Sequence, residues 1–287
     1  MRYNTSIVKK CQDYLRWKHK KQGLKGEEMS MKKEVMVDMT SGRIAPQILR
    51  FAMPVLLGLV FQRIYNFADS YIVGHFLGDN ALAAVSVAGV GMYLVFSLII
   101  GLTTGVTVVM SQYYGAKEED KVVKTFFSSI FIALGMTILV TVIGLLTTRP
   151  LLIVLQTPAE VLDAAVLYLR IICAGSVGTM LYNWISAVLR SLGNSVVPLI
   201  FLGISSLLNI VFDILFVAVI PMGVGGAAFA TVLAQIISGV ACLLYAWKIL
   251  PMLRIRRDKL KLDTYIGKQM LCLLYTSPSP RDRQKSR

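Results

Sequence analysis

Six long apolar segments follow one another along the chain, separated by short stretches rich in glycine, proline and charge. They lie at residues 46–74, 81–112, 122–147, 161–190, 195–219 and 226–249. Each reaches the ~20 mostly apolar residues that a helix needs to cross a bilayer, and the residues between them are typical of helix boundaries. The pattern predicts an all-α membrane protein whose transmembrane region, residues 44–250, is a bundle of six helices.

The composition supports a membrane protein. Of the 287 residues, 55% are hydrophobic and 16% are charged, and the mean hydropathy of +0.65 is too high for an ordinary soluble domain. A net charge of +14 also fits nucleic-acid binding. The basic residues flank the apolar segments, however, so we expect a lipid bilayer as the partner and no nucleic acid.

The basic residues are divided unequally between the two sides of the predicted bundle. Twelve Lys and Arg precede or include Arg50 and seven lie at 248–268, whereas the three loops expected on the opposite side contain only Arg149. Because cytoplasmic loops carry an excess of Lys and Arg, we expect both termini to be cytoplasmic and the protein to be a multi-pass protein of the inner membrane.

Both ends of the chain differ from the bundle. Residues 1–43 form a polar, basic leader without the apolar core of a signal peptide, and later methionines offer alternative starts at Met29, Met31 and Met36. Residues 251–271 are predicted to be a cytoplasmic amphipathic linker. Residues 272–287 turn abruptly rich in Ser, Pro and Arg, which indicates an artefactual segment or a natural disordered tail.

Two carboxylates, Asp69 and Asp213, lie within apolar helices, where an ionisable group costs ~2.5–3.5 kcal/mol. Each belongs to a polar stripe at helical spacing, and a third helix carries a similar stripe. The three stripes are Gln62, Asn66 and Asp69; Ser206, Asn209 and Asp213; and Thr179, Asn183 and Ser186. Residues at such spacings share one helix face, so we expect these faces to line a common interior cavity.

The polar residues have two possible roles. Interhelical hydrogen bonds alone would explain Thr179, Ser186 and Ser206, but uncharged residues would serve that purpose better than Asp69 and Asp213. Two carboxylates in a low-dielectric cavity cannot both ionise without a cation. Either one holds a proton or the pair binds a metal cation, and both states suit an antiporter.

Other chemistry is less well supported. Arg63 could neutralise a carboxylate, but it lies about 240° around its helix from Asp69, which favours a separate contact. The four cysteines form no CxxC pair, and the sequence contains neither HExxH nor GxSxG. We therefore predict no disulfide, no bound cofactor and no enzymatic activity.

Several segments resemble bacterial transporters of the multidrug and toxic compound extrusion (MATE) family. They are residues 38–89, with the order P…Q…YN…D…VG…LG…ALAA, then GLTTGVTVVMSQYYGAK, LRSLGNSVVPL and LNIVFDILF…GVGGAAFATVLAQ. The resemblance covers about residues 38–270. Full members have twelve helices in two lobes, so it implies that this chain corresponds to the amino-terminal lobe.

The resemblance also implies a site and a function. The positions that match the family's cation site are Asp69, Asn209, Asp213 and Thr231, with Na⁺ as a possible metal ion, and Gln62, Asn66, Thr179, Asn183 and Ser206 are candidates for the cavity lining. The implied function is export of a small, cationic amphipathic drug by an H⁺- or Na⁺-coupled antiporter that acts as a monomer. The alternative is a flippase for lipid-linked oligosaccharides, which would require several cations in its cavity.

Overall fold

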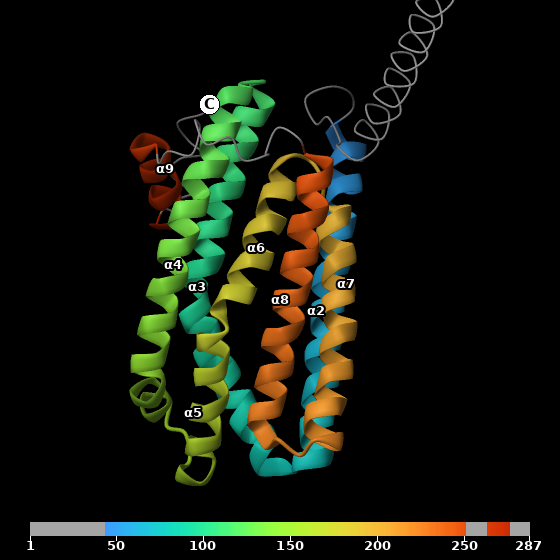
Figure 1. Ribbon diagram of the computed structural model, residues 1–287, viewed down its shortest axis with the longest axis vertical. Helices are drawn as coiled ribbons and strands as arrows, with labels where there is room; N and C mark the ends of the chain where they lie inside the picture. Colours follow the sequence, from blue (N-terminus) through green and yellow to red (C-terminus); the bar gives the residue numbers. More distant parts are fainter. Residues whose placement is uncertain (1–43, 251–262, 276–287) are drawn as a thin grey trace, which may run out of the picture. The chain divides into compact units, whose positions relative to one another are not determined.

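The computed structural model describes residues 44–250 and 263–275, and all of their regular structure is helical (Figure 1). The predicted leader at 1–43, residues 251–262 of the predicted linker and residues 276–287 of the predicted tail lie outside the described residues. The helices are α2 (Ile44–Leu77), α3 (Asp79–Gly115), α4 (Glu119–Val154), α5 (Ala159–Ala174), α6 (Ser176–Ser191), α7 (Val196–Asp213), the π-helical η1 (Ile214–Val219), α8 (Gly223–Ile249) and α9 (Thr264–Tyr275).

Six spans can be formed from these helices, as predicted. Helices α2, α3, α4 and α8 and the continuous α7–η1 unit are each long and apolar enough to cross a membrane, and α5 and α6 together make the sixth span. The predicted single helix at 161–190 is wrong in one respect, because it bends by 50° between α5 and α6. The fold class predicted from the hydrophobic pattern is confirmed.

Gly175, where the bend lies, packs closely against α8. A Cβ atom on Gly175 would overlap the side chain of Val232, and a Cβ on Gly178 would lie 2.6 Å from Cγ1 of Ile236. One turn of helix further on, Gly239 of α8 leaves room for the backbone of Tyr182. Small residues thus let the two helices approach each other, as they commonly do in membrane bundles.

Two further features of the helices were not predicted. Helix α4 continues through Pro150 to Val154 and does not end at residue 147, and its last turns pack Leu151 and Leu152 beside Gly91 of α3. Helix α7 changes to π-helical geometry directly after Asp213. Single π-helical turns are frequent at functional sites, and this one begins at a buried carboxylate.

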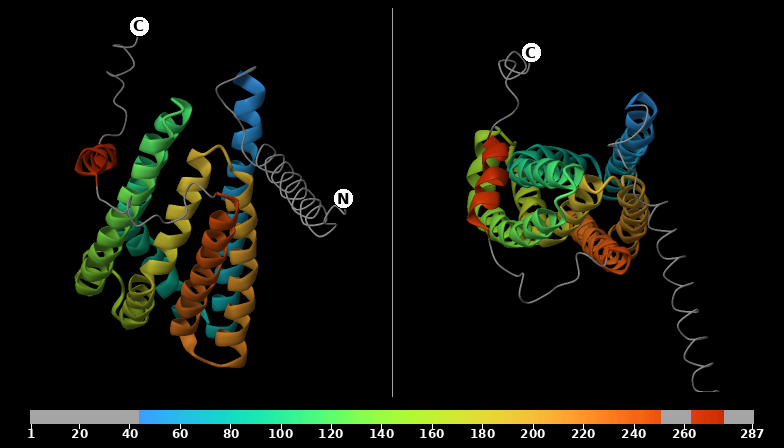
Figure 2. Two further views of the ribbon diagram at one scale, coloured as in Figure 1. Left: turned by 45° about the horizontal axis from the view of Figure 1, so that its top comes forward. Right: turned by 90° about the horizontal axis from the view of Figure 1, so that it is seen from above.

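The candidate site lies where α2, α7 and α8 meet (Figure 1). Helix α7 packs against both α2 and α8, and α8 also packs against α5 and α6. Figure 2 shows the same helices from two further directions. This arrangement brings residues about 140 positions apart in the sequence, such as Asp69 and Asp213, to one place in the bundle.

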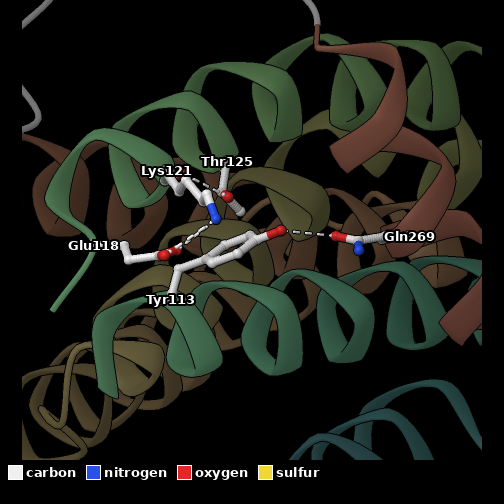
Figure 3. Close-up of polar contacts among 5 residues, drawn as sticks. All are labelled: Tyr113, Glu118, Lys121, Thr125 and Gln269. Atoms are coloured by element: carbon white, nitrogen blue, oxygen red, sulfur yellow. Dashed lines mark hydrogen bonds and ion pairs between the residues drawn. The ribbon is translucent and has the colours of Figure 1, made fainter. Parts of the chain in front are cut away.

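Helix α9 packs against α3 and α4, and Figure 3 shows its polar contact with Tyr113 of α3. The Tyr113 hydroxyl donates a hydrogen bond to Oε1 of Gln269 at 3.0 Å, and the backbone amide of Asp263 donates to Oγ of Ser128 at 2.9 Å. Met270, the residue after Gln269, is fully buried. A Cβ on Gly105 would lie 2.5 Å from the carbonyl oxygen of Met270, so this glycine allows α9 to dock.

Candidate cation site

The two carboxylates predicted from the sequence face each other inside the bundle. Asp69 of α2 is 8% exposed and Asp213, the last residue of α7, is 0% exposed. Their carboxyl groups are close enough to interact directly. The helix faces that carry Asp69 and Asp213 therefore point into the bundle and not toward lipid.

Asn209 and Thr231 lie beside this acidic pair and are joined to each other. Asn209 precedes Asp213 by about one turn of α7 and is 3% exposed. Its Nδ2 donates a hydrogen bond to Oγ1 of Thr231 at 3.2 Å, and the Thr231 hydroxyl donates to the carbonyl of Ala227 at 3.2 Å. With its hydrogen directed at Ala227, the threonine oxygen can accept from Asn209, and the amide oxygen of Asn209 takes no part in these two hydrogen bonds.

The site contains acceptor oxygens without donors. Within the described part of the chain, Oδ1 of Asp69, both carboxyl oxygens of Asp213 and Oδ1 of Asn209 are buried and have no hydrogen-bond partner. Buried polar atoms are normally satisfied, and an exception calls for an explanation. Buried acceptor oxygens without a donor on these neighbouring residues fit a proton shared between carboxyl groups or a hard cation such as Na⁺, which prefers oxygen ligands.

Three residues near the site were missed by the sequence analysis. Tyr65 of α2 and Tyr168 of α5 lie close enough to the acidic pair to interact with its charge. Gln235 lines a small cavity together with Asn209 and Thr231, and its Oε1 is a further buried acceptor without a partner in the described residues. Gln235 follows Thr231 by four positions on α8, so helical spacing from Thr231 would have identified it.

The cavity-lining candidates divide between two cavities that share Leu202. Ser206 lines the small cavity beside Asn209 and Thr231. Gln62 and Asn183 line a second one, of about 120 Å³, between α2, α6 and α7. Asn66 is exposed, Thr179 is half-buried, and neither lines these two cavities.

The arginines at 63 and 170 lie away from the acidic pair, in line with the interpretation favoured for Arg63. Arg63 and Arg170 are both exposed. In residues 44–250 and 263–275 the ion pairs are Lys121 with Glu118 and Arg149 with Asp163, so Arg63 neutralises neither carboxylate of the acidic pair. The arginine that does line a cavity is Arg190, the last residue of the predicted segment 161–190, which the sequence analysis did not single out.

Curated proteins similar to this chain include two that are described as probable multidrug resistance proteins. The "Probable multidrug resistance protein YpnP" of Bacillus subtilis is 35% identical over 212 residues, which cover 74% of this chain and 47% of that protein. The "Probable multidrug resistance protein NorM" of Thermotoga maritima is 28% identical and is covered over 44% of its length. The chain thus spans about half the length of the curated relatives it matches.

A solved structure shares the fold. It is that of a MOP superfamily transporter from Pyrococcus furiosus, which superposes with a TM-score of 0.75 at 24% identity and covers 83% of this chain and 52% of its own. That structure is described as having a binding pocket of reverse polarity that suggests a different function.

The sequence profile of the MatE family matches residues 54–215. This match begins in α2, includes Asp69, Asn209 and Asp213, and ends in η1. It covers more than half of the chain, and the bundle described above has the fold of one lobe of such a transporter. The chain is therefore a multi-pass membrane protein that belongs to the MATE (MatE) family.

Proposed function

We propose that the full-length protein is a cation-coupled antiporter that exports drugs across the cytoplasmic membrane by alternating access. The observation that carries the proposal is the set of four buried acceptor oxygens, on Asp69, Asp213 and Asn209, without a donor among the described residues. A cation that fills this set removes the repulsion between the carboxylates. It can shift the transporter between two states only if it binds one state better than the other.

We propose ligands for the cation from the residues of the site. A proton would be held on one carboxyl and shared with the other, whereas Na⁺ would take oxygens from Asp69, Asp213 and Asn209, with Thr231 fixing the amide. The π-helical turn directly after Asp213 supports such a role, because single π-helical turns are frequent at functional sites. The relatives described as multidrug resistance proteins support a drug as the transported molecule.

Export is better supported than flipping of a lipid-linked oligosaccharide. A flippase of that kind holds a pyrophosphate, which calls for several cations around the cavity. Of the two cavities described above, one is lined by a single arginine and the other by no charged residue. We further propose that the full-length protein acts as a monomer on cationic amphipathic substrates, with both termini cytoplasmic.

The coupling is tested by dye efflux. Cells that express the full-length protein are loaded with ethidium, energised, and followed by fluorescence while either the proton or the sodium gradient is collapsed. We expect efflux to stop when the coupling gradient is removed and to continue when the other is removed. Efflux that continues at the parent rate after both gradients are collapsed would contradict cation coupling.

A further inference from the structure

The cavity of about 120 Å³ between α2, α6 and α7 is separate from the cation site and has a different chemistry. Its walls are largely apolar and include Pro54, Leu59 and Leu199. Its polar members are Gln62, Tyr182, Asn183, Arg190 and Ser195. Arg190 is the one charged residue among the residues that line it, so the polarity of this cavity is opposite to that of the acidic pair.

Arg190 is partly withdrawn from solvent without a partner of opposite charge. Its side chain is half-buried, and in the described parts of the chain its guanidinium forms no ion pair and donates no hydrogen bond. Nearby polar groups are already engaged, since Tyr182 donates to the carbonyl of Pro198 and Asn183 donates to that of Thr179. The five N–H donors of Arg190 are therefore available to a ligand.

We propose that this cavity binds the carboxylate or phosphate head of an amphipathic organic anion. The guanidinium of Arg190 would hold two oxygens of the head in the bidentate geometry that arginine favours, with the amide of Gln62 as an additional donor. A void of about 150 Å³ holds one benzene molecule, so only the head and its first few atoms fit inside. The apolar remainder would lie against Pro54, Leu59 and Leu199.

A simpler role for Arg190 makes a different prediction. The residue lies in the last turn of α6, where any cation interacts favourably with the helix dipole. Lys248 occupies the same position in α8 and is exposed. Lys248→Gln is therefore a matched control that removes a helix-end cation without changing the cavity.

The proposal is tested by binding, which does not depend on whether the chain exports anything. The purified 287-residue chain in neutral detergent is titrated with dansylglycine, which carries a carboxylate, and with dansylglycinamide, which is its neutral analogue. We expect the carboxylate to bind at least about tenfold more tightly than the amide. Arg190→Gln should remove this preference, Arg190→Lys should retain part of it, and Lys248→Gln should leave it unchanged.

The same titration can contradict the proposal. Equal binding of both probes by the parent chain, or an unchanged preference in Arg190→Gln, would contradict the proposal. Arg190 would then act only as a cation at the end of its helix. Arg190→Lys is the decisive variant if Arg190→Gln does not fold, as judged by gel filtration in detergent. If Arg190→Lys keeps the full preference for the carboxylate probe, the guanidinium is not what recognises the anion.

Competition identifies the source of the anion. Displacement of dansylglycine by phosphatidylglycerol, but not by phosphatidylcholine, supports a lipid phosphate as the ligand. Failure of both lipids to displace it supports a soluble carboxylate. Equal displacement by both lipids indicates that apolar contact alone drives binding, and the proposal is then wrong.

Discussion

At the residue scale, burial decides which polar residues of the spans come together. Asp69, Asn209 and Asp213 were identified from their depth in apolar helices, and they lie next to one another in the structure. Gln235 and Arg190 were not identified, because a glutamine near a helix middle and an arginine near a helix end have ordinary explanations. Their positions depend on which helix faces meet, which a single sequence does not specify.

The oxygen set of the cation site gives one prediction at this scale. Asn209→Leu in the full-length protein removes an acceptor oxygen and the hydrogen bond to Thr231, so we expect the concentration of coupling cation needed for half-maximal efflux to rise by about tenfold or more. Ser206→Ala is the matched control. The Ser206 hydroxyl donates within its own helix, to the carbonyl of Leu202, and its loss should change this concentration less than about threefold.

The packing of α6 on α8 gives a second prediction. A Cβ on Gly178 would lie 2.6 Å from Cγ1 and 3.0 Å from the backbone nitrogen of Ile236, whereas a Cβ on Gly203 has no neighbour within 4 Å. Gly178→Ala should therefore lower the free energy of unfolding in detergent by about 1–3 kcal/mol. Gly203→Ala should leave it unchanged or raise it by up to about 1 kcal/mol. Equal effects would show that the two helices do not pack closely at Gly178.

At the scale of helices, the hydrophobic pattern predicted the number and order of the spans but not their breaks. Six apolar segments separated by charge and glycine are enough to locate six helices. The bend at Gly175 was missed because the helix-period pattern continues through it, and the close approach of Val232 from α8 to this glycine depends on tertiary packing. The extension of α4 past Pro150 was also missed, because the contacts of Leu151 and Leu152 with α3 depend on tertiary packing.

Helix α9 provides a prediction at this scale. Met270 is fully buried against α3, whereas Tyr265 on the same helix is 68% exposed. Met270→Ala should weaken docking by about 2–5 kcal/mol, so amide hydrogen exchange across residues 264–270 should accelerate. Tyr265→Ala should not change the exchange rates in this segment. Exchange that is unaffected by both substitutions would mean that Met270 does not hold α9 in place.

At the scale of the whole molecule, the distribution of basic residues predicts the orientation in the membrane. In a background without native cysteines, Ala159→Cys at the start of α5 and Glu119→Cys at the start of α4 place one exposed thiol at each end of the bundle. We expect a membrane-impermeant maleimide added to intact cells to label Cys at position 159 and not at 119. Labelling at position 119 and not at 159 would show that the protein has the opposite orientation in the membrane.

Membership of the MATE family does not by itself give this chain an activity, because it spans about half the length of the relatives it matches. A drug path between two lobes requires both of them. The lobe described above nevertheless contains the buried carboxylates to which we assign coupling. Coupling can therefore be tested in the full-length protein by changing residues of this lobe alone.

The most direct test of that assignment is ethidium efflux from energised cells that express full-length protein with Asp69→Asn or Asp213→Asn. Each change removes one carboxylate and alters little volume, so the protein should remain in the membrane. Asp163→Asn is the control, because the side chain of Asp163 is 83% exposed in a surface ion pair with Arg149. We predict that both buried variants lose export and that the control retains it. Export by Asp69→Asn and Asp213→Asn at the parent rate would contradict the proposal that these carboxylates couple cation binding to transport.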